Sequence, residues 1–205
     1  MRSITRFLTV VALSAIGFAQ AIAQAPQGGG GGQAPAGRGP QVPPLILTTT
    51  AFEDGGVIPD KYTQAAGPMA VSPEVKWSQV PTGTQSFVLL LHDPEPVLNK
   101  GSKMDITHWL IWNIPATATG LKEGVAQGEL PDGSRQVSLR TNAYMGPGAP
   151  AGPYHHYTFE LYALDTRLDI AQGTPQEAAA TRVSVFNAMD GHVLGKALLV
   201  GRFHR

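Results

Sequence analysis

Two acids, two histidines and a tyrosine stand beside apolar segments, where side chains of these types can bind ligands or move protons. Asp93 and Glu95 directly follow an apolar run, within the sequence Asp-Pro-Glu-Pro. The two prolines restrict the backbone around both acids, which predicts a stiff loop at the end of a strand. A turn in which the Asp only caps its own backbone is the structural alternative.

His108 opens the apolar sequence His-Trp-Leu-Ile-Trp-Asn, which is typical of a buried strand. Because side chains alternate along a strand, we expect His108, Leu110 and Trp112 to share one face. A buried imidazole is tolerated once it has one good hydrogen-bond partner. A structural histidine and a site histidine therefore both fit this segment.

The sequence His-His-Tyr opens another candidate strand. Alternation places His155 and Tyr157 on one face and His156 on the other, so we expect only His155 and Tyr157 to join one pocket. His156 is predicted to be solvated or packed elsewhere. The preceding loop, residues 144–153, is rich in Gly and Pro, so its backbone can approach a ligand closely and present amide groups to an anion. A tight, rigid connection is the alternative interpretation.

Short apolar runs separated by Gly, Pro, Asn and Asp predict that the elements carrying these residues are strands. They cover residues 45–49, 86–91, 107–113, 137–139, 157–164 and 197–200. The second run is apolar on both faces, as in a central strand covered on both sides, whereas the fifth alternates more clearly. A mainly β protein with two layers would bury both kinds of strand.

One helix near the C-terminus is well signalled. Thr174 supplies a capping hydroxyl, proline follows at the first helical position, and Glu177 stands three residues after the cap. Asp190-Gly191 provides a stop. We expect one apolar stripe of this helix to pack on the core, formed by Ala179, Val183, Phe186 and Met189.

The N-terminus has the features of an export signal. Arg2 and Arg6 precede an apolar run at 7–18, and small residues stand at the two positions that a signal peptidase reads. A membrane anchor is the alternative, but a span needs about 20 apolar residues and this run is shorter. We predict a signal peptide at 1–23, a periplasmic or secreted location, and no transmembrane helix in the mature form.

The amino-acid composition limits the domain organisation, partners and chemistry of the rest of the chain. Residues 24–44 hold seven Gly and five Pro, which predicts a disordered linker before one domain at 45–205. Fifteen basic residues balance fifteen acidic ones, which argues against nucleic acid as a partner. The absence of cysteine excludes disulfides, thiolate nucleophiles and cysteine-bound metals.

Taken in order, these segments resemble the phosphatidylethanolamine-binding protein family, in particular its bacterial Raf kinase inhibitor-like branch. The resemblance covers about residues 52–205. Its specific motifs are Asp93-Pro94-Glu95, His108-Trp109, Asn113-Ile114-Pro115, Gly146-Pro147, His155-His156-Tyr157, Tyr162-Ala163-Leu164-Asp165 and Gly191-His192. Two departures are Glu95-Pro96-Val97, where the family usually has Asp-Ala-Pro, and Gly148-Ala149, where bacterial members often have Cys-Pro.

The resemblance implies a β-sandwich with one or two peripheral helices and a small pocket for phosphate or a phospholipid headgroup. The residues implied for this pocket are Asp93, Glu95, His108, His155 and Tyr157. The predicted function is that of an exported, non-enzymatic binding protein without a cofactor.

Three other functions stay open on the sequence. The polar residues would suit acid–base catalysis, although no nucleophile motif accompanies them. A metal site could use His108, His155, Asp93 and Glu95, although no local His-Glu-x-x-His pattern supports it. The chain could also act as an inhibitor or scaffold of an extracytoplasmic protein such as a protease.

Overall fold

The computed structural model describes residues 44–205, except 99, 102 and 104. The predicted signal peptide and the predicted linker up to residue 43 lie outside the described residues. Within the described part, the chain is mainly β and forms two sheets, as expected. No helix of this part is both long enough and apolar enough to cross a bilayer.

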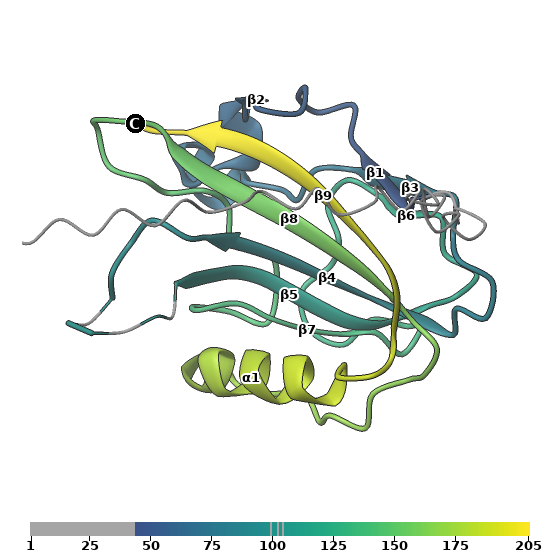
Figure 1. Cartoon of the computed structure of the whole chain (residues 1–205). Coiled ribbons are helices and arrows are strands. Elements are labelled where there is room, and N and C mark those ends of the chain that lie inside the picture. Colours follow the sequence, from purple (N-terminus) through teal and green to yellow (C-terminus); the bar gives the residue numbers. More distant parts are fainter. Residues whose placement is uncertain (1–43, 99, 102, 104) are drawn as a thin grey trace, which may run out of the picture. The chain divides into compact units, whose positions relative to one another are not determined.

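The larger sheet has six strands in the order β2-β9-β8-β4-β5-β7, and the smaller has three in the order β1-β3-β6 (Figure 1). All pairs are antiparallel except β2 with β9. The strands are β1 (Ile46–Thr48), β2 (Gly56–Val57), β3 (Val75–Ser78), β4 (Ser86–Asp93), β5 (Ile106–Pro115), β6 (Gly120–Leu121), β7 (Arg135–Val137), β8 (His155–Leu164) and β9 (Val193–Phe203).

Every predicted apolar run contributes to a strand, although β7 ends where its run at 137–139 begins. The prediction omitted β2, β3 and β6. Two of these have only two residues, and β3 has four, with Val75 and Trp77 buried in alternation. Such short segments carry too few alternating positions to stand out in the sequence.

Strand β4 is buried at all eight positions because both of its faces are covered. On one face, Phe87 and Leu89 belong to a core that includes Trp77 of the small sheet. On the other face, Val88 and Leu90 belong to a second core that includes the C-terminal helix. Each fully buried side chain of this size contributes about 1.5–3 kcal/mol, so both layers stabilise the central strand.

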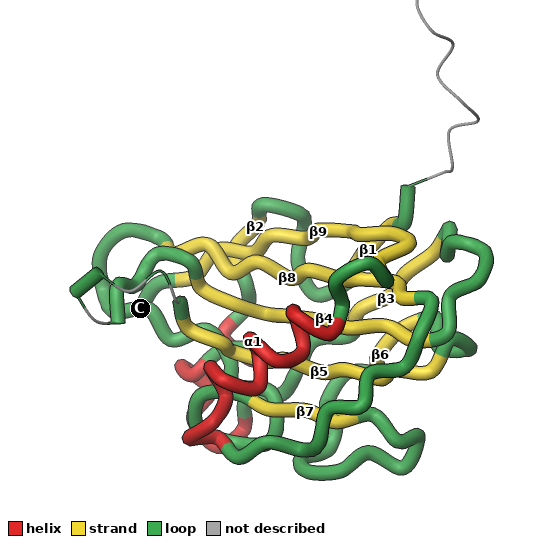
Figure 2. Tube along the Cα trace, turned by 60° about the horizontal axis from the view of Figure 1, so that its bottom comes forward, coloured by secondary structure: helices red, strands yellow, loops and turns green. Residues whose placement is uncertain are grey.

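The C-terminal helix lies over the large sheet on the side opposite the small one (Figure 2). The α-helix α1 (Ala178–Ala188) continues the 3-10 helix η3 (Pro175–Glu177), and the predicted capping box of Thr174 and Glu177 is present.

The predicted stripe of this helix is wrong in part. Ala179 and Val183 are exposed, whereas the buried residues are Ala178, Thr181, Val185 and Met189. Both sets repeat every three or four residues. Met189 belongs to both sets, and Phe186 is partly buried against the same core as predicted, so the local spacing alone does not decide the rest of the inward face.

Alternation along β5 is interrupted at His108. Leu91 of β4 pairs with Trp109 and the next residue pairs with Thr107, so His108 is an extra residue on β5. Such a β-bulge re-aims a side chain. The ring of His108 packs edge-on against Tyr157 at 5.1 Å, whereas Leu110 lies in the core under α1. The prediction that His108 shares a face with Leu110 is therefore wrong.

Candidate functional site

The site begins where two rows of core side chains end. On β4, Asp93 comes two residues after buried Leu91, and on β8, His155 comes two residues before buried Tyr157. Leu91 and Tyr157 both belong to the core between the two sheets. Because β4 and β8 are antiparallel neighbours, the last residues of β4 lie beside the first residues of β8 at one end of the sheet. Asp93 and His155 therefore lie together at this end, on the sheet face that covers that core.

Both carboxylate oxygens of Asp93 have a hydrogen-bond partner. Oδ2 lies 2.7 Å from Nδ1 of His155, and Oδ1 accepts a hydrogen bond from the backbone N–H of Glu95 at 3.1 Å. The Asp93 side chain is only 2% exposed, and that of His155 is 23% exposed. The predicted Asp-centred turn is therefore present, and the same carboxylate also orients a histidine. The structural and binding interpretations of this segment are compatible.

His108 reaches the same region through the β5 bulge. Its Nδ1 lies 2.9 Å from the carbonyl oxygen of Met145 and 3.1 Å from that of Gly146. Because carbonyl oxygens only accept, Nδ1 carries a proton and Nε2 is left for a ligand. Burial lowers the pKa of His108 below its ordinary value of 6.5, against the opposing effects of these carbonyls and of Asp93.

Tyr157 joins the strand to the Gly/Pro-rich loop. Its hydroxyl oxygen accepts hydrogen bonds from the backbone N–H groups of Gly148 at 3.1 Å and Ala149 at 2.9 Å. Burial, with a smaller contribution from the charge of Asp93, raises the pKa of Tyr157 to about 12. The phenol therefore keeps its proton at neutral pH. The amides of Gly148 and Ala149, expected to serve an anion directly, are instead bonded to this tyrosine.

The loop is fixed from its other side by Gln64, in the 3-10 helix η2 (Gln64–Met69). The Gln64 backbone N–H donates to the carbonyl oxygen of Pro147, and Nε2 donates to that of Gly146, both at 2.8 Å. A Cβ atom at Gly146 would lie 2.7 Å from the carbonyl oxygen of Tyr62, so only glycine fits this approach. The sequence carried no signal for Gln64, because its loop partner is 82 positions away.

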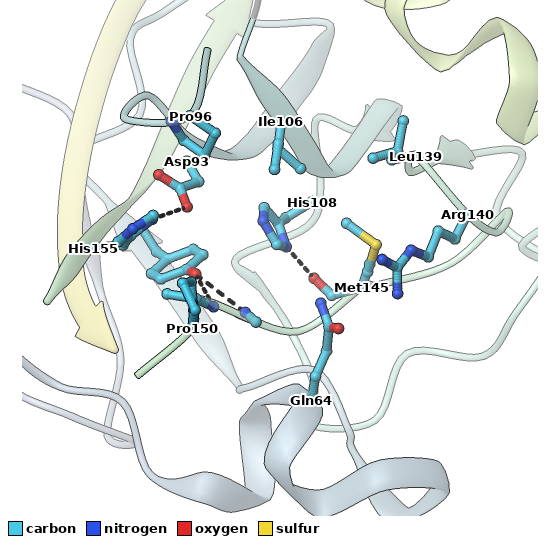
Figure 3. A pocket seen from close by; sticks show the side chains of 13 residues that line it. Gln64, Asp93, Pro96, Ile106, His108, Leu139, Arg140, Met145, Pro150 and His155 are labelled. Atoms are coloured by element: carbon cyan, nitrogen blue, oxygen red, sulfur yellow. Dashed lines mark hydrogen bonds and ion pairs between the residues drawn. The ribbon is translucent and has the colours of Figure 1, made fainter. Parts of the chain in front are cut away.

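These residues surround a cavity of about 130 Å³ (Figure 3). Asp93, His108, His155 and Tyr157 line its polar part, and the exposed Arg140 also contributes to its wall. The other lining residues are Gln64, Pro96, Ile106, Leu139, Met145, Gly148, Ala149 and Pro150. Of these additional residues, Pro96, Leu139 and the members of the 144–153 loop lay in segments predicted from the sequence, whereas Gln64, Ile106 and Arg140 did not.

Glu95 lies beside the cavity rather than in its wall. One of its carboxylate oxygens accepts the backbone N–H of His156 at 2.9 Å, and the other lies 3.2 Å from Nδ1 of that histidine. Burial acts to raise the pKa of Glu95, but these contacts and the two nearby histidines outweigh it and lower the pKa. The structure thus gathers four of the five predicted residues around the cavity and places the fifth at its side.

One group of at least three His, Asp or Glu side chains in the described part of the chain has donor atoms close enough to hold a metal ion. It consists of Asp93, Glu95 and His155, whose donor atoms lie within 4.8 Å of one another. His108, which the sequence analysis had considered for a metal site, is outside this group.

Relatives of this chain are found by sequence. The family model described as phosphatidylethanolamine-binding protein matches residues 48–204. A UPF0098 protein of Methanothermobacter thermautotrophicus is 44% identical over 164 residues, covering 78% of this chain and 99% of the relative. The UPF0098 protein YbhB of Escherichia coli is 35% identical over 137 residues, covering 63% of this chain and 84% of the relative.

Solved structures agree with this assignment. A putative phosphatidylethanolamine-binding protein homolog, CT736 from Chlamydia trachomatis, matches with a TM-score of 0.64 and 28% identity over 79% of this chain and 98% of its own. YbcL of Escherichia coli, described as a new member of the mammalian phosphatidylethanolamine-binding protein family, matches with a TM-score of 0.63 and 25% identity over 78% of this chain and 98% of its own. This chain therefore belongs to the phosphatidylethanolamine-binding protein family.

Proposed function

We propose that this chain is an exported, non-enzymatic binding protein whose cavity takes a phosphoryl group, either as inorganic phosphate or within a phospholipid headgroup. The observation that carries the proposal is the convergence of the Asp93–His155 pair, His108 and Tyr157 on one small cavity. Membership of the family supports a binding role.

The size of the cavity favours a small ligand. Pockets that enclose drug-sized molecules have about 300–1,000 Å³, whereas this one has about 130 Å³. Such a cavity suits a phosphate or a headgroup but not a pair of acyl chains. A phospholipid would therefore place its polar end inside and leave its chains outside.

The hydrogen-bond donors around the cavity suit an anion, provided that the negative charge of buried Asp93 is offset. At 4 Å, two like charges repel by about 4 kcal/mol at an effective dielectric constant near 20. Asp93 directs Oδ2 toward His155 and Oδ1 toward a backbone N–H, which offsets part of this repulsion. The Tyr157 hydroxyl, the Arg140 guanidinium and a protonated His108 are then the donors for phosphoryl oxygens.

The lining residues favour binding over catalysis. Among the described residues that line the cavity, none is Ser, Thr, Cys or Lys, the side chains that most often act as nucleophiles. The Tyr157 hydroxyl has a pKa of about 12 and is bonded to two amides, so it is a weak nucleophile at neutral pH.

Export is proposed from residues 1–23 alone. Fractionation of cells that express the full chain tests it. We expect a processed protein in the periplasm or medium, and an unprocessed cytoplasmic protein would contradict the proposal.

Native mass spectrometry of the purified full-length product tests the ligand without a prior guess at its identity. Calorimetric titration with inorganic phosphate and with glycerophosphoethanolamine then separates the two sources of the phosphoryl group. We expect saturable binding of at least one probe at one site per chain. Absence of both a copurified phosphoryl compound and titratable binding would refute the proposal.

A further inference from the structure

Three donor atoms beside the cavity lie close enough together to share one metal ion. Nδ1 of His155 lies 2.7 Å from Oδ2 of Asp93 and 3.8 Å from Oε2 of Glu95. Bonds of about 2.0–2.1 Å in a tetrahedral site place neighbouring ligand atoms about 3.3 Å apart. The two observed separations lie on either side of this value. Small rotations of the side chains would therefore supply three of the four ligands of a tetrahedral ion.

Two of the three side chains, those of Asp93 and Glu95, are also held by further hydrogen bonds, as metal ligands commonly are. Asp93 accepts the backbone N–H of Glu95, which ties the two acids to one turn. The Glu95 carboxylate accepts a hydrogen bond from the backbone N–H of His156, and its other oxygen lies 3.2 Å from Nδ1 of the same residue. Asp93 ends β4 and His155 opens β8, so two of the three ligands stand on paired strands rather than on a free loop.

We propose that Asp93, Glu95 and His155 form a binding site for one divalent transition-metal ion at the edge of the cavity. One imidazole and two carboxylates suit ions such as Zn²⁺ or Co²⁺, because Mg²⁺ and Ca²⁺ favour all-oxygen sites with more ligands. The sequence left a metal site only as an alternative, and with His108 as a fourth ligand. His108, bonded to the Met145 carbonyl group, is not part of the site.

A metal ion here would also place positive charge where the two carboxylates stand. Three protein ligands leave a position of a four-coordinate ion open, and Asp93 and His155 both line the cavity. A phosphoryl oxygen could occupy that position. This bridging role rests on the proposed function, whereas the metal site itself does not.

Calorimetric titration of chelator-treated, tag-free protein with ZnCl₂ in a non-coordinating buffer tests the site. We expect one ion per chain, with affinity reduced at least about tenfold in Glu95→Gln and in His155→Gln, since losing even an outer partner of a metal ligand costs 10–100-fold. Co²⁺ should give the visible absorption of a low-coordinate ion, and this signal should weaken in both variants. Circular dichroism and melting curves check that the variants fold.

His192→Gln is the matched control, because it removes an exposed histidine whose Nδ1 lies 2.7 Å from Asp165 and which has no place in the proposed site. We expect its metal affinity to equal that of the unmodified protein. Failure to find one-to-one binding, or equal affinity in Glu95→Gln, His155→Gln and the control, would overturn the proposal.

Glycerophosphoethanolamine titrated with and without Zn²⁺ separates this inference from the proposed function. Tighter phosphoryl binding in the presence of the ion supports bridging. Phosphoryl binding in chelator with no metal binding leaves the proposed function standing and refutes the metal site. Metal binding without any phosphoryl binding supports the site and refutes both the bridging and the proposed function.

Discussion

Nδ1 of His155 and Oδ2 of Asp93 lie 2.7 Å apart, although 62 positions separate the two residues in the chain. Asp93 is the next side chain on the same face of β4 after the core residue Leu91, and His155 is the neighbour of the core residue Tyr157 on the same face of β8. The polar pair is therefore placed by the same strand register that builds the core.

Replacing His155 tests this pair. In His155→Ala the buried Asp93 carboxylate loses its hydrogen bond to the imidazole and repels the ligand more strongly. We therefore expect the affinity for glycerophosphoethanolamine to fall by about 1.5–3 kcal/mol, or about 10- to 150-fold. Calorimetry in chelator measures the effect, with His192→Ala as the control on an exposed His–Asp pair. Equal affinities in the two variants would contradict the assignment.

The affinity for the same ligand should depend on pH through His108. Burial lowers the pKa of this imidazole, so it is neutral at pH 7 and must gain a proton before Nε2 can donate to a phosphoryl oxygen. Affinity should therefore fall as pH rises between about pH 5 and pH 8.

A phosphodiester is the right probe for this measurement, because inorganic phosphate itself titrates in the same range. His108→Gln should flatten the pH profile. A profile of the unmodified protein that is already flat, measured by titration at several pH values, would exclude His108 as a donor.

Tyr157→Phe should loosen the loop as well as weaken the site. It removes the acceptor of the Gly148 and Ala149 amides. A buried donor without its partner costs about 1–3 kcal/mol, and we expect a loss of this order in the free energy of unfolding.

Urea unfolding measures the loss, and hydrogen exchange at the two amides localises it. Tyr154→Phe serves as a control, since Tyr154 is 39% exposed. Unchanged exchange at Gly148 and Ala149 would show that the hydroxyl does not hold the loop.

A second polar cluster lies on the α1 side of the large sheet. Nδ1 of His92 lies 2.6 Å from Asp105 and Nε2 lies 3.5 Å from Glu160, while Arg182 of α1 pairs with Asp105. The contact with His92 is the main cause that lowers the pKa of Glu160 from 4.5 to about 2, against burial. Burial opposes charge on His92, but its contacts with Asp105 and Glu160 outweigh burial and raise its pKa above 6.5.

These shifts predict a pH window for stability. The lowered pKa of Glu160 stabilises the fold fully above pH 4.5, and this contribution is lost as pH falls toward about 2. The raised pKa of His92 stabilises the fold fully below pH 6.5, and this contribution is lost as pH rises through the folded-state value. The cluster therefore stabilises the fold most between pH 4.5 and pH 6.5, the ordinary pKa values of the two groups.

Glu160→Gln should lower the free energy of unfolding most inside this window, by on the order of 3 kcal/mol at 1.36 kcal/mol per unit of pKa shift. Urea unfolding at three pH values, below, within and above the window, checks the prediction. Glu129→Gln, a change at an exposed position, should alter the free energy of unfolding by the same amount at all three pH values. An equal loss at all three pH values in Glu160→Gln would refute the electrostatic origin.

Much of the fold was predictable because local patterns carry it. Apolar runs marked five of the six strands of the large sheet, all except β2, and the capping box at Thr174 marked the start of the C-terminal helix. Alternation correctly separated His155 and Tyr157 from His156, whose side chain is 52% exposed. These features depend on residues within a few positions of one another.

The sequence by itself determined that Asp93 and His155 stand at the ends of apolar strands, because hydrophobic periodicity is a property of each segment alone. Only the tertiary structure decided that His108 faces the cavity, because a bulge depends on how β5 pairs with β4. It also decided that Gln64 holds the loop and that Glu95 turns toward His156. Contacts between residues tens of positions apart depend on strand register and chain direction, which no local pattern records.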